Sequence, residues 1–152
     1  MTTLYLDMNI NNRPFDDQGQ MRIRLETTAI TMVWALIQSG TFAAKWSFVL
    51  DYENSRNPFV ERRAFAHYLA QACEGTIEPN EGIREMARRL ERLEIRGRDA
   101  LHLACAEWAG CDYLVTCDDQ LVQQGKRLVE AGELGLKVIN PVDLLREEKR
   151  WR

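Results

Sequence analysis

Short, continuously apolar runs alternate along the chain with longer segments in which apolar residues recur every three or four positions. A continuous apolar run bounded by polar residues is typical of a strand that is buried on both faces. Runs of this kind predict strands at residues 4–6, 47–50, 76–77, 113–115 and 136–139. The polar segment 9–19, which contains Pro14 and Gly19, is expected to be a loop.

The periodic segments predict helices between these strands. The first helix is expected from residue 20 to Gly40, with an apolar face formed by Leu25, Ala29, Met32, Val33 and Leu36. Asn57-Pro58 and Pro79-Asn80 are expected to open the next two, with apolar faces formed by Val60, Ala64, Tyr68 and Ala72, and by Ile83, Met86, Ala87, Leu90 and Leu93. Segment 99–109 is apolar nearly all round and predicts a buried helix.

Continuous apolar strands that alternate with helices favour a parallel sheet with helices on both faces. We therefore expect an α/β fold: a three-layer α/β/α sandwich around a mostly parallel sheet of four to five strands. Residues 1–145 are expected to form one domain, followed by a charged C-terminal tail at 146–152 that frays.

Composition narrows the class of protein further. The chain has 152 residues, 45% of them hydrophobic and 28% charged, which excludes a disordered or collagen-like chain. The formal net charge of −3 argues against nucleic-acid binding through bulk positive charge alone.

No apolar run approaches the length that spans a bilayer, and the N-terminus lacks a signal-peptide pattern, so a cytoplasmic protein without membrane contact is expected. The cysteine spacing fits no zinc motif, and two histidines are too few for a histidine-rich metal site.

Acidic residues follow the predicted strands. Asp7 comes directly after the first strand, Glu53 three residues after the second, and Asp118 after the strand at 113–115, while Asp99 begins a helix. The N-terminus of a covering helix lies at the edge where parallel strands end, so all four should meet there. Each could separately be a strand terminator, a helix cap or a loop residue. Together they would repel one another, and a divalent cation, Mg²⁺ or Mn²⁺, would remove that repulsion.

These residues resemble the motifs of the PIN-domain nucleases, in particular the prokaryotic toxin-like (VapC-like) members. The first strand ends in Asp7-Met-Asn9, and Ser47 stands six residues before Glu53. The later motifs are Arg-Asp-Ala-Leu-His-Leu-Ala at 98–104 and Leu-Val-Thr-Cys-Asp-Asp at 114–119. The motifs occur in the family's order and cover nearly the whole chain, while segment 12–18 is outside the general pattern.

The resemblance implies a Mg²⁺- or Mn²⁺-dependent endoribonuclease in which metal-activated water hydrolyses RNA phosphodiester bonds. One or two ions would be held by Asp7, Glu53, Asp99 and Asp118. Asn9 and Thr116 would orient carboxylates or bound water, and Asp119 would be a helix-dipole partner or an auxiliary ligand, since the sequence leaves open which of Asp118 and Asp119 faces the metal. Substrate RNA would be held by Arg13, Arg56 and Arg62. The resemblance also implies a homodimer and a small antitoxin partner, if the chain is the toxin of a toxin–antitoxin pair.

Other function classes fit the residues less well. A phosphoacceptor domain of the response-regulator type needs an acidic pair near the first strand and a late lysine at a strand end, but Asp7 stands without an adjacent acid and Lys137 falls within a strand. A phosphatase with an aspartate nucleophile needs a second Asp where Asn9 stands. The remaining alternative is a non-catalytic PIN-fold module that binds RNA or protein.

Overall fold

The computed structural model describes residues 1–149, and within them five parallel strands form one sheet with the order β3-β2-β1-β4-β5. The strands are β1 (Thr2–Leu6), β2 (Phe42–Ser47), β3 (Thr76–Ile77), β4 (Tyr113–Val115) and β5 (Lys137–Ile139). The sheet is registered by pairs such as Leu4 with Ala44 and Tyr5 with Leu114. The predicted α/β fold with a parallel sheet is confirmed, and β1 lies at its centre.

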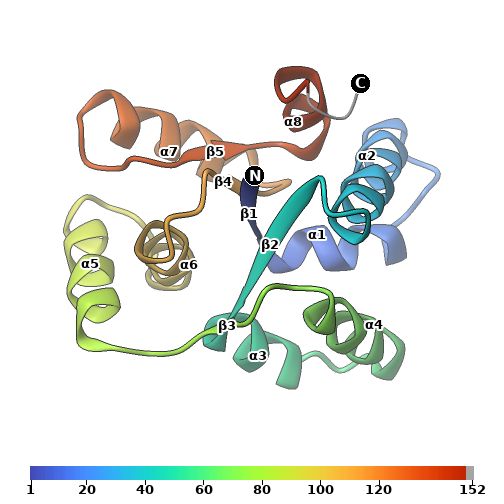
Figure 1. The fold of residues 1–152 in the computed structure, drawn as a ribbon, viewed down its shortest axis with the longest axis horizontal. Coiled ribbons are helices and arrows are strands. Elements are labelled where there is room, and N and C mark those ends of the chain that lie inside the picture. Colours follow the sequence, from blue (N-terminus) through green and yellow to red (C-terminus); the bar gives the residue numbers. More distant parts are fainter. Residues whose placement is uncertain (150–152) are drawn as a thin grey trace.

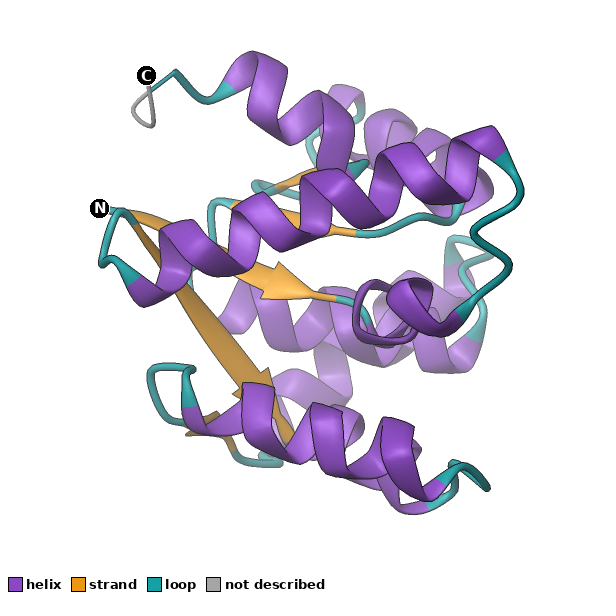
Figure 2. Ribbon diagram, turned by 90° about the vertical axis from the view of Figure 1, so that its right-hand side faces the viewer, coloured by secondary structure: helices purple, strands orange, loops and turns teal. Residues whose placement is uncertain are grey.

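Helices cover both faces of the sheet. They are α1 (Met8–Asn12), α2 (Met21–Gln38), α3 (Phe48–Ser55), α4 (Val60–Gln71), α5 (Glu81–Arg92), α6 (Gly97–Trp108), α7 (Asp119–Glu130) and α8 (Pro141–Glu147), with a 3-10 helix η1 (Arg13–Phe15) after α1. One core joins α5, α6 and α7 to the sheet, and a second core joins α2 and α8 to the other face. Figures 1 and 2 show the strands enclosed between these groups of helices.

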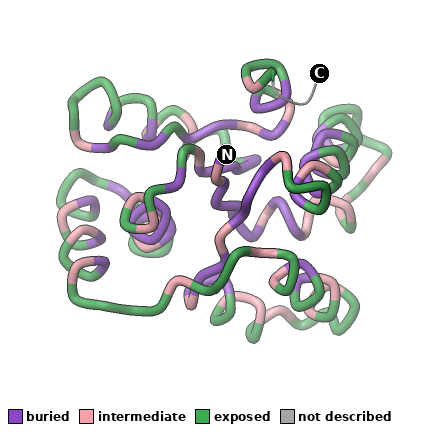
Figure 3. Tube along the Cα trace, in the orientation of Figure 1, coloured by how far each residue is buried: buried purple, intermediate pink, exposed green. Residues whose placement is uncertain are grey.

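The central strand β1 is continuously apolar because both of its faces are buried. Successive side chains of a strand point to opposite faces, so Leu4 and Leu6 join one core while Tyr5 joins the other. All three are buried, and buried residues follow the strands and the inward sides of the helices (Figure 3). Because both faces are covered, no alternating polar position is needed in β1.

The structure corrects the predicted second strand. Residues 47–50 do not form a strand: β2 is Phe42–Ser47, and Phe48 begins α3. The Ser47 hydroxyl accepts a hydrogen bond from the backbone N–H of Leu50 at 3.2 Å, which caps the helix. Glu53 therefore lies on a helix and not on a loop.

Two further segments also differ from prediction. Residues 9–19 are not a continuous loop, because α1 and η1 occupy most of that stretch. Helix α8 was not predicted, and it extends to Glu147, into the segment expected to be the tail; residues 150–152 of that tail lie outside the described residues. The division of the chain at residue 145 stays a prediction.

The predicted apolar face of α2 is partly wrong, and that of α4 is wrong. Leu25 and Met32 of α2 are exposed, and the buried face is instead Ile23, Glu26, Ala29, Ile30, Val33, Trp34 and Ile37. In α4 all four predicted residues, Val60, Ala64, Tyr68 and Ala72, are exposed, and the buried residues are Ala66 and Leu69. Both helices carry two neighbouring apolar stripes, so spacing alone does not tell which stripe packs inward. In α5, by contrast, the buried Ile83, Ala87 and Leu90 lie on the predicted face.

Within residues 1–149, no helix combines the length and the apolar character that crossing a membrane would require.

Candidate functional site

Asp7 lies where β1 ends at the centre of the sheet. Its side chain caps α1, with Oδ1 accepting the N–H of Met8 at 2.8 Å. Its Oδ2 accepts hydrogen bonds from the Thr116 hydroxyl at 2.9 Å and from the Asn9 side-chain amide at 3.2 Å. Thr116 follows the neighbouring strand β4, so two adjacent strand ends position one buried carboxylate.

Asn9 ties these two strand ends together. Its amide nitrogen also reaches the Thr116 hydroxyl at 2.9 Å, and its side-chain oxygen accepts the N–H of Cys117 at 3.1 Å. The Thr116 hydroxyl oxygen in turn accepts the N–H of Asp118 at 3.1 Å. The turn after β4 is therefore held against the turn after β1 by side-chain hydrogen bonds.

Glu53 reaches the same edge from α3 and meets a histidine there. Its Oε1 lies 2.6 Å from Nε2 of His102 on α6, and its Oε2 lies 3.6 Å from the guanidinium of Arg98. His102 Nε2 is also 3.7 Å from Asp7 Oδ1. Among the described residues, the side chains of Asp7, Glu53 and His102 each offer an atom within 4.8 Å of the other two, which is close enough to share a metal ion.

A chain of buried hydrogen bonds lies behind His102. The Tyr5 hydroxyl is 2.6 Å from His102 Nδ1 and 2.6 Å from the Ser47 hydroxyl. Burial raises the pKa of Tyr5 well above its ordinary value, so the hydroxyl stays protonated. A carboxylate only accepts hydrogen bonds, so His102 Nε2–H donates to Glu53. In the neutral ring Nδ1 then accepts from Tyr5, and Ser47 donates to Tyr5.

The electrostatics of the edge reflect crowding of negative charge. Burial, with a contribution from Glu53, raises the pKa of Asp7 despite its hydrogen bonds and His102. Burial lowers the pKa of His102, but the hydrogen bond to Glu53 and the charges of Asp7, Glu53 and Asp99 outweigh it, so the net shift is upward.

Asp99 and Asp118 face the same cluster. Burial, then the charges of Asp7 and Asp118, raise the pKa of Asp99. Asp99 lies in the first turn of α6 but is not its cap, because Arg96 occupies the N-cap position. Asp118 does cap α7, with Oδ1 accepting the N–H groups of Gln120 at 3.0 Å and Leu121 at 3.3 Å. Both acids lie near the strand ends, although neither belongs to the tighter group of Asp7, Glu53 and His102.

The Asp119 carboxylate forms an ion pair outside this cluster. Its two carboxylate oxygens each lie 2.7 Å from the guanidinium of Arg22 on α2, and this bidentate pairing lowers the pKa of Asp119. Asp119 is in the first turn of α7, where its charge is favourable to the helix dipole.

The three arginines expected to hold substrate have different surroundings. Arg13 pairs with Asp16 and with the buried carboxylate of Glu26, both at 3.2 Å, and so ties η1 to α2. Arg56 and Arg62 instead line a hollow of about 440 Å³ beside Glu53, and Arg98 lines it too.

His102, Tyr5 and Arg98 were not singled out as site residues from the sequence. A signal for two of them is present at 98–104: Arg98 adjoins Asp99, and His102 follows Asp99 by three positions, which places the two on one helix face. No local signal marks Tyr5, because it is one of three apolar residues in a buried strand.

This donor set fits a divalent cation. The carboxylate oxygens of Asp7 and Glu53 suit Mg²⁺ or Mn²⁺, and a cation would relieve the repulsion that contributes to the raised pKa of Asp7 and Asp99. His102 donates its Nε2–H to Glu53 and accepts from Tyr5 at Nδ1, so it orients the Glu53 carboxylate beside such an ion.

Comparison with known proteins places the fold. No protein-family model matches the chain, and no curated protein matches it. Among solved structures, a chain of VapBC2 from Rickettsia felis, bound to a DNA fragment from its promoter, aligns with a TM-score of 0.55 at 16% identity, covering 90% of this chain and 98% of that one. A chain of DNA-bound VapBC from Salmonella typhimurium aligns with a TM-score of 0.52 at 17% identity, covering 93% and 99%. At these identities the likeness establishes the fold alone: the chain shares its architecture with a chain of each VapBC complex, in agreement with the PIN-like fold expected from the sequence.

Proposed function

We propose that the chain is a metal-dependent endoribonuclease that hydrolyses RNA phosphodiester bonds. The observation that carries the proposal is the convergence of carboxylates from separate elements on the edge where β1 and β4 end, with buried Asp7 at their centre. Crowded acids are costly unless they bind a cation, so this arrangement is better explained by function than by stability.

Asp7, Glu53, Asp99 and Asp118 would hold one or two Mg²⁺ or Mn²⁺ ions. A bound ion would supply a Lewis acid that lowers the pKa of water and offsets charge on the phosphate. Thr116 and Asn9 hold Asp7 in one orientation through hydrogen bonds at 2.9 and 3.2 Å. The pairing of Asp119 with Arg22 supports Asp118 as the ligand of the two.

The chain's arginines would bring the phosphate backbone to this acidic site. Arg56, Arg62 and Arg98 line the hollow that also contains Glu53, so cations and a catalytic carboxylate share one opening. Arg13 is better explained as a structural residue, because buried Glu26 and Asp16 hold its guanidinium.

We also propose that the nuclease is the toxin of a toxin–antitoxin pair and is neutralised by a small antitoxin. The support is the architecture shared, over nearly its full length, with chains of two VapBC complexes. The homodimer and the cytoplasmic location stay predictions. Sequencing the flanking DNA for a short open reading frame, and co-expressing its product with this chain, would test the pair: relief of growth arrest and co-purification are expected, and neither is expected if the chain acts alone.

A cleavage assay tests the nuclease itself. A 5′-labelled single-stranded RNA is incubated with the protein in Mg²⁺ or Mn²⁺, in chelator, and with the Asp7→Asn variant. Cleavage is expected only for wild type with metal. RNA binding without cleavage under all metal conditions would contradict the proposal and favour the non-catalytic PIN-fold module.

A further inference from the structure

Two exposed aromatic side chains lie near the opening that leads to Glu53. Phe59 is 57% exposed and lines the same hollow as Glu53, Arg56, Arg62 and Arg98. Tyr52, on α3 beside Glu53, is 53% exposed. Exposed apolar side chains that group beside a candidate active site are typical of a surface that binds a ligand.

Phe59 is held in place by an arginine. The Arg62 guanidinium carbon lies 4.7 Å from the centre of the Phe59 ring and 5.5 Å from that of Phe15. Arg62 is itself fixed, because it donates to the Phe15 carbonyl at 3.2 Å and lies 3.8 Å from the Asp16 carboxylate. The Phe59 ring is therefore supported by Arg62 while more than half of the residue faces solvent.

A second pair of the same kind lies nearby. The Arg56 guanidinium carbon lies 5.6 Å from the centre of the Tyr52 ring, and Arg56 lines the hollow. Each aromatic ring thus adjoins a cation, and the lining of the hollow carries three arginines against one acid, Glu53.

This chemistry matches single-stranded nucleic acid better than a protein segment. Unpaired bases stack on exposed aromatic rings, and arginines beside the rings contact the backbone phosphates. A duplex keeps its bases stacked on one another and offers no ring faces to Phe59. A purely apolar protein segment would bring no negative group to an opening that three arginines line.

We propose that Phe59, supported by Arg62, is a base-stacking platform that holds an unpaired nucleotide beside the carboxylate site, and that Tyr52 with Arg56 extends it. The proposal rests on the proposed ribonuclease function and adds a substrate-positioning surface to it. Stacking makes few demands on base identity, so the platform selects single strands rather than a sequence.

Binding can be measured separately from cleavage. Fluorescence anisotropy of a labelled single-stranded oligoribonucleotide is recorded with the Asp7→Asn protein, which keeps the RNA intact. Stacking on one aromatic residue contributes enough that Phe59→Ala should weaken binding about 5- to 100-fold, while Phe59→Trp should retain it. An oligoribonucleotide of the same length without bases should bind the parent and Phe59→Ala proteins equally.

The matched control is Tyr68→Ala. Tyr68 is also on the α4 side of the molecule and is 60% exposed, but it does not line the hollow, so its removal should leave affinity unchanged. Unchanged affinity of Phe59→Ala, or equal loss in both variants, would overturn the platform. Loss of antitoxin binding by Phe59→Ala with RNA affinity intact would also overturn it and make the surface a protein-docking site. Failure of the wild type to cleave while these binding differences persist would count against the nuclease and not against the platform.

Discussion

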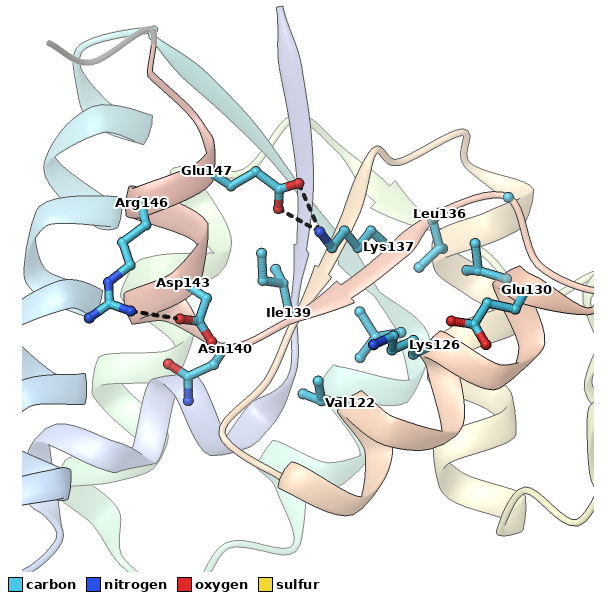
Figure 4. A pocket seen from close by; sticks show the side chains of 13 residues that line it. Val122, Lys126, Glu130, Leu136, Lys137, Ile139, Asn140, Asp143, Arg146 and Glu147 are labelled. Carbon is cyan, nitrogen blue, oxygen red and sulfur yellow. Dashed lines mark hydrogen bonds and ion pairs between the residues drawn. The ribbon is translucent and has the colours of Figure 1, made fainter.

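Two hollows of this molecule contrast in size and in charge. The larger, about 690 Å³, lies against the edge strand β5 between α7 and α8 (Figure 4). Four of its charged residues form two ion pairs: Lys137 Nζ lies 2.8 and 2.9 Å from the Glu147 carboxylate, and Arg146 lies 3.8 Å from Asp143. The smaller, about 440 Å³, opens beside Glu53 and the crowded carboxylates.

This difference indicates that an excess of like charge is a better guide to a candidate active site than the volume of a hollow. Positive and negative residues line the β5 hollow in equal number, so nothing there requires a cation. At the carboxyl edge, like charges contribute to raising the pKa of Asp7 and Asp99. Even the polar residue that follows β5 is used structurally, because Asn140 caps α8 and donates to Glu26 at 2.6 Å.

The largest expected effect separates the two hollows by a matched pair of variants. Asp7→Asn should lower the rate of RNA cleavage by at least about 10³-fold, because an amide replaces a carboxylate that would help to hold a hard cation. Asp143→Asn, in the β5 hollow, should leave the rate unchanged. Circular dichroism verifies that both are folded. Wild-type activity in Asp7→Asn would remove this residue from the site.

Asp99→Asn tests the outer part of the carboxylate group. Arg96 occupies the N-cap of α6, so loss of the Asp99 charge should cost at most about 1 kcal/mol of stability through the helix dipole. Cleavage should nevertheless fall at least about 100-fold if Asp99 contributes to a metal site. Urea denaturation and a cleavage assay are run on the same preparation. Full activity with unchanged stability would restrict the proposed ligands to Asp7, Glu53 and Asp118.

Metal ions should stabilise the wild type by binding only its folded state. At 100 times the dissociation constant the gain is about 2.7 kcal/mol, or about 5–10 °C in Tm. The shift should vanish in a variant with Asp7, Asp99 and Asp118 all changed to Asn, and that variant should melt higher than wild type in chelator because the repulsion is gone. A Mn²⁺-independent Tm in wild type would contradict the metal site.

Tyr5→Phe tests the hydrogen-bond chain behind Glu53. The change keeps the packing but leaves buried His102 Nδ1 and the Ser47 hydroxyl without the Tyr5 hydroxyl, which should cost about 1–3 kcal/mol of the free energy of unfolding. Tyr68→Phe removes an exposed hydroxyl and should cost nothing measurable. If both variants were equally stable in urea, the hydrogen bonds from Tyr5 to His102 and Ser47 would not be formed in solution.

The smallest effect is expected in the β5 hollow. Lys137→Gln breaks an exposed ion pair with Glu147, so stability should fall by less than about 1 kcal/mol and cleavage should not change. A cleavage defect in this variant would show that the larger hollow takes part in function, contrary to the assignment of activity to the hollow beside Glu53.

Much of the fold and part of the site could be predicted from the sequence. Asp7, Asp118 and Thr116 adjoin short apolar strands, so the position of each follows from its own segment. β2 was misplaced because Phe42–Ser47 contains two alanines and a lysine, a weak strand pattern, whereas the apolar residues after it belong to a capped helix.

The roles of charged residues were harder to predict than their positions. Arg13 lies near the site in sequence, but its guanidinium pairs with Glu26, which the sequence gives no reason to expect in a buried position. Polar groups are paired by tertiary contacts, and a residue's surroundings do not follow from its neighbours along the chain.

The sequence by itself determined the order of the five strands and of the longer helices between them, and the acidic residues that follow the strands, because periodicity and capping are local properties of the chain. Only the tertiary structure decided that Glu53 meets His102, 49 positions away, and that His102 meets Tyr5, 97 positions away. These contacts depend on β2 pairing with β1 and on α6 packing against the same face of the sheet. Burial then makes each hydrogen bond between them necessary, since a buried polar group without a partner is costly.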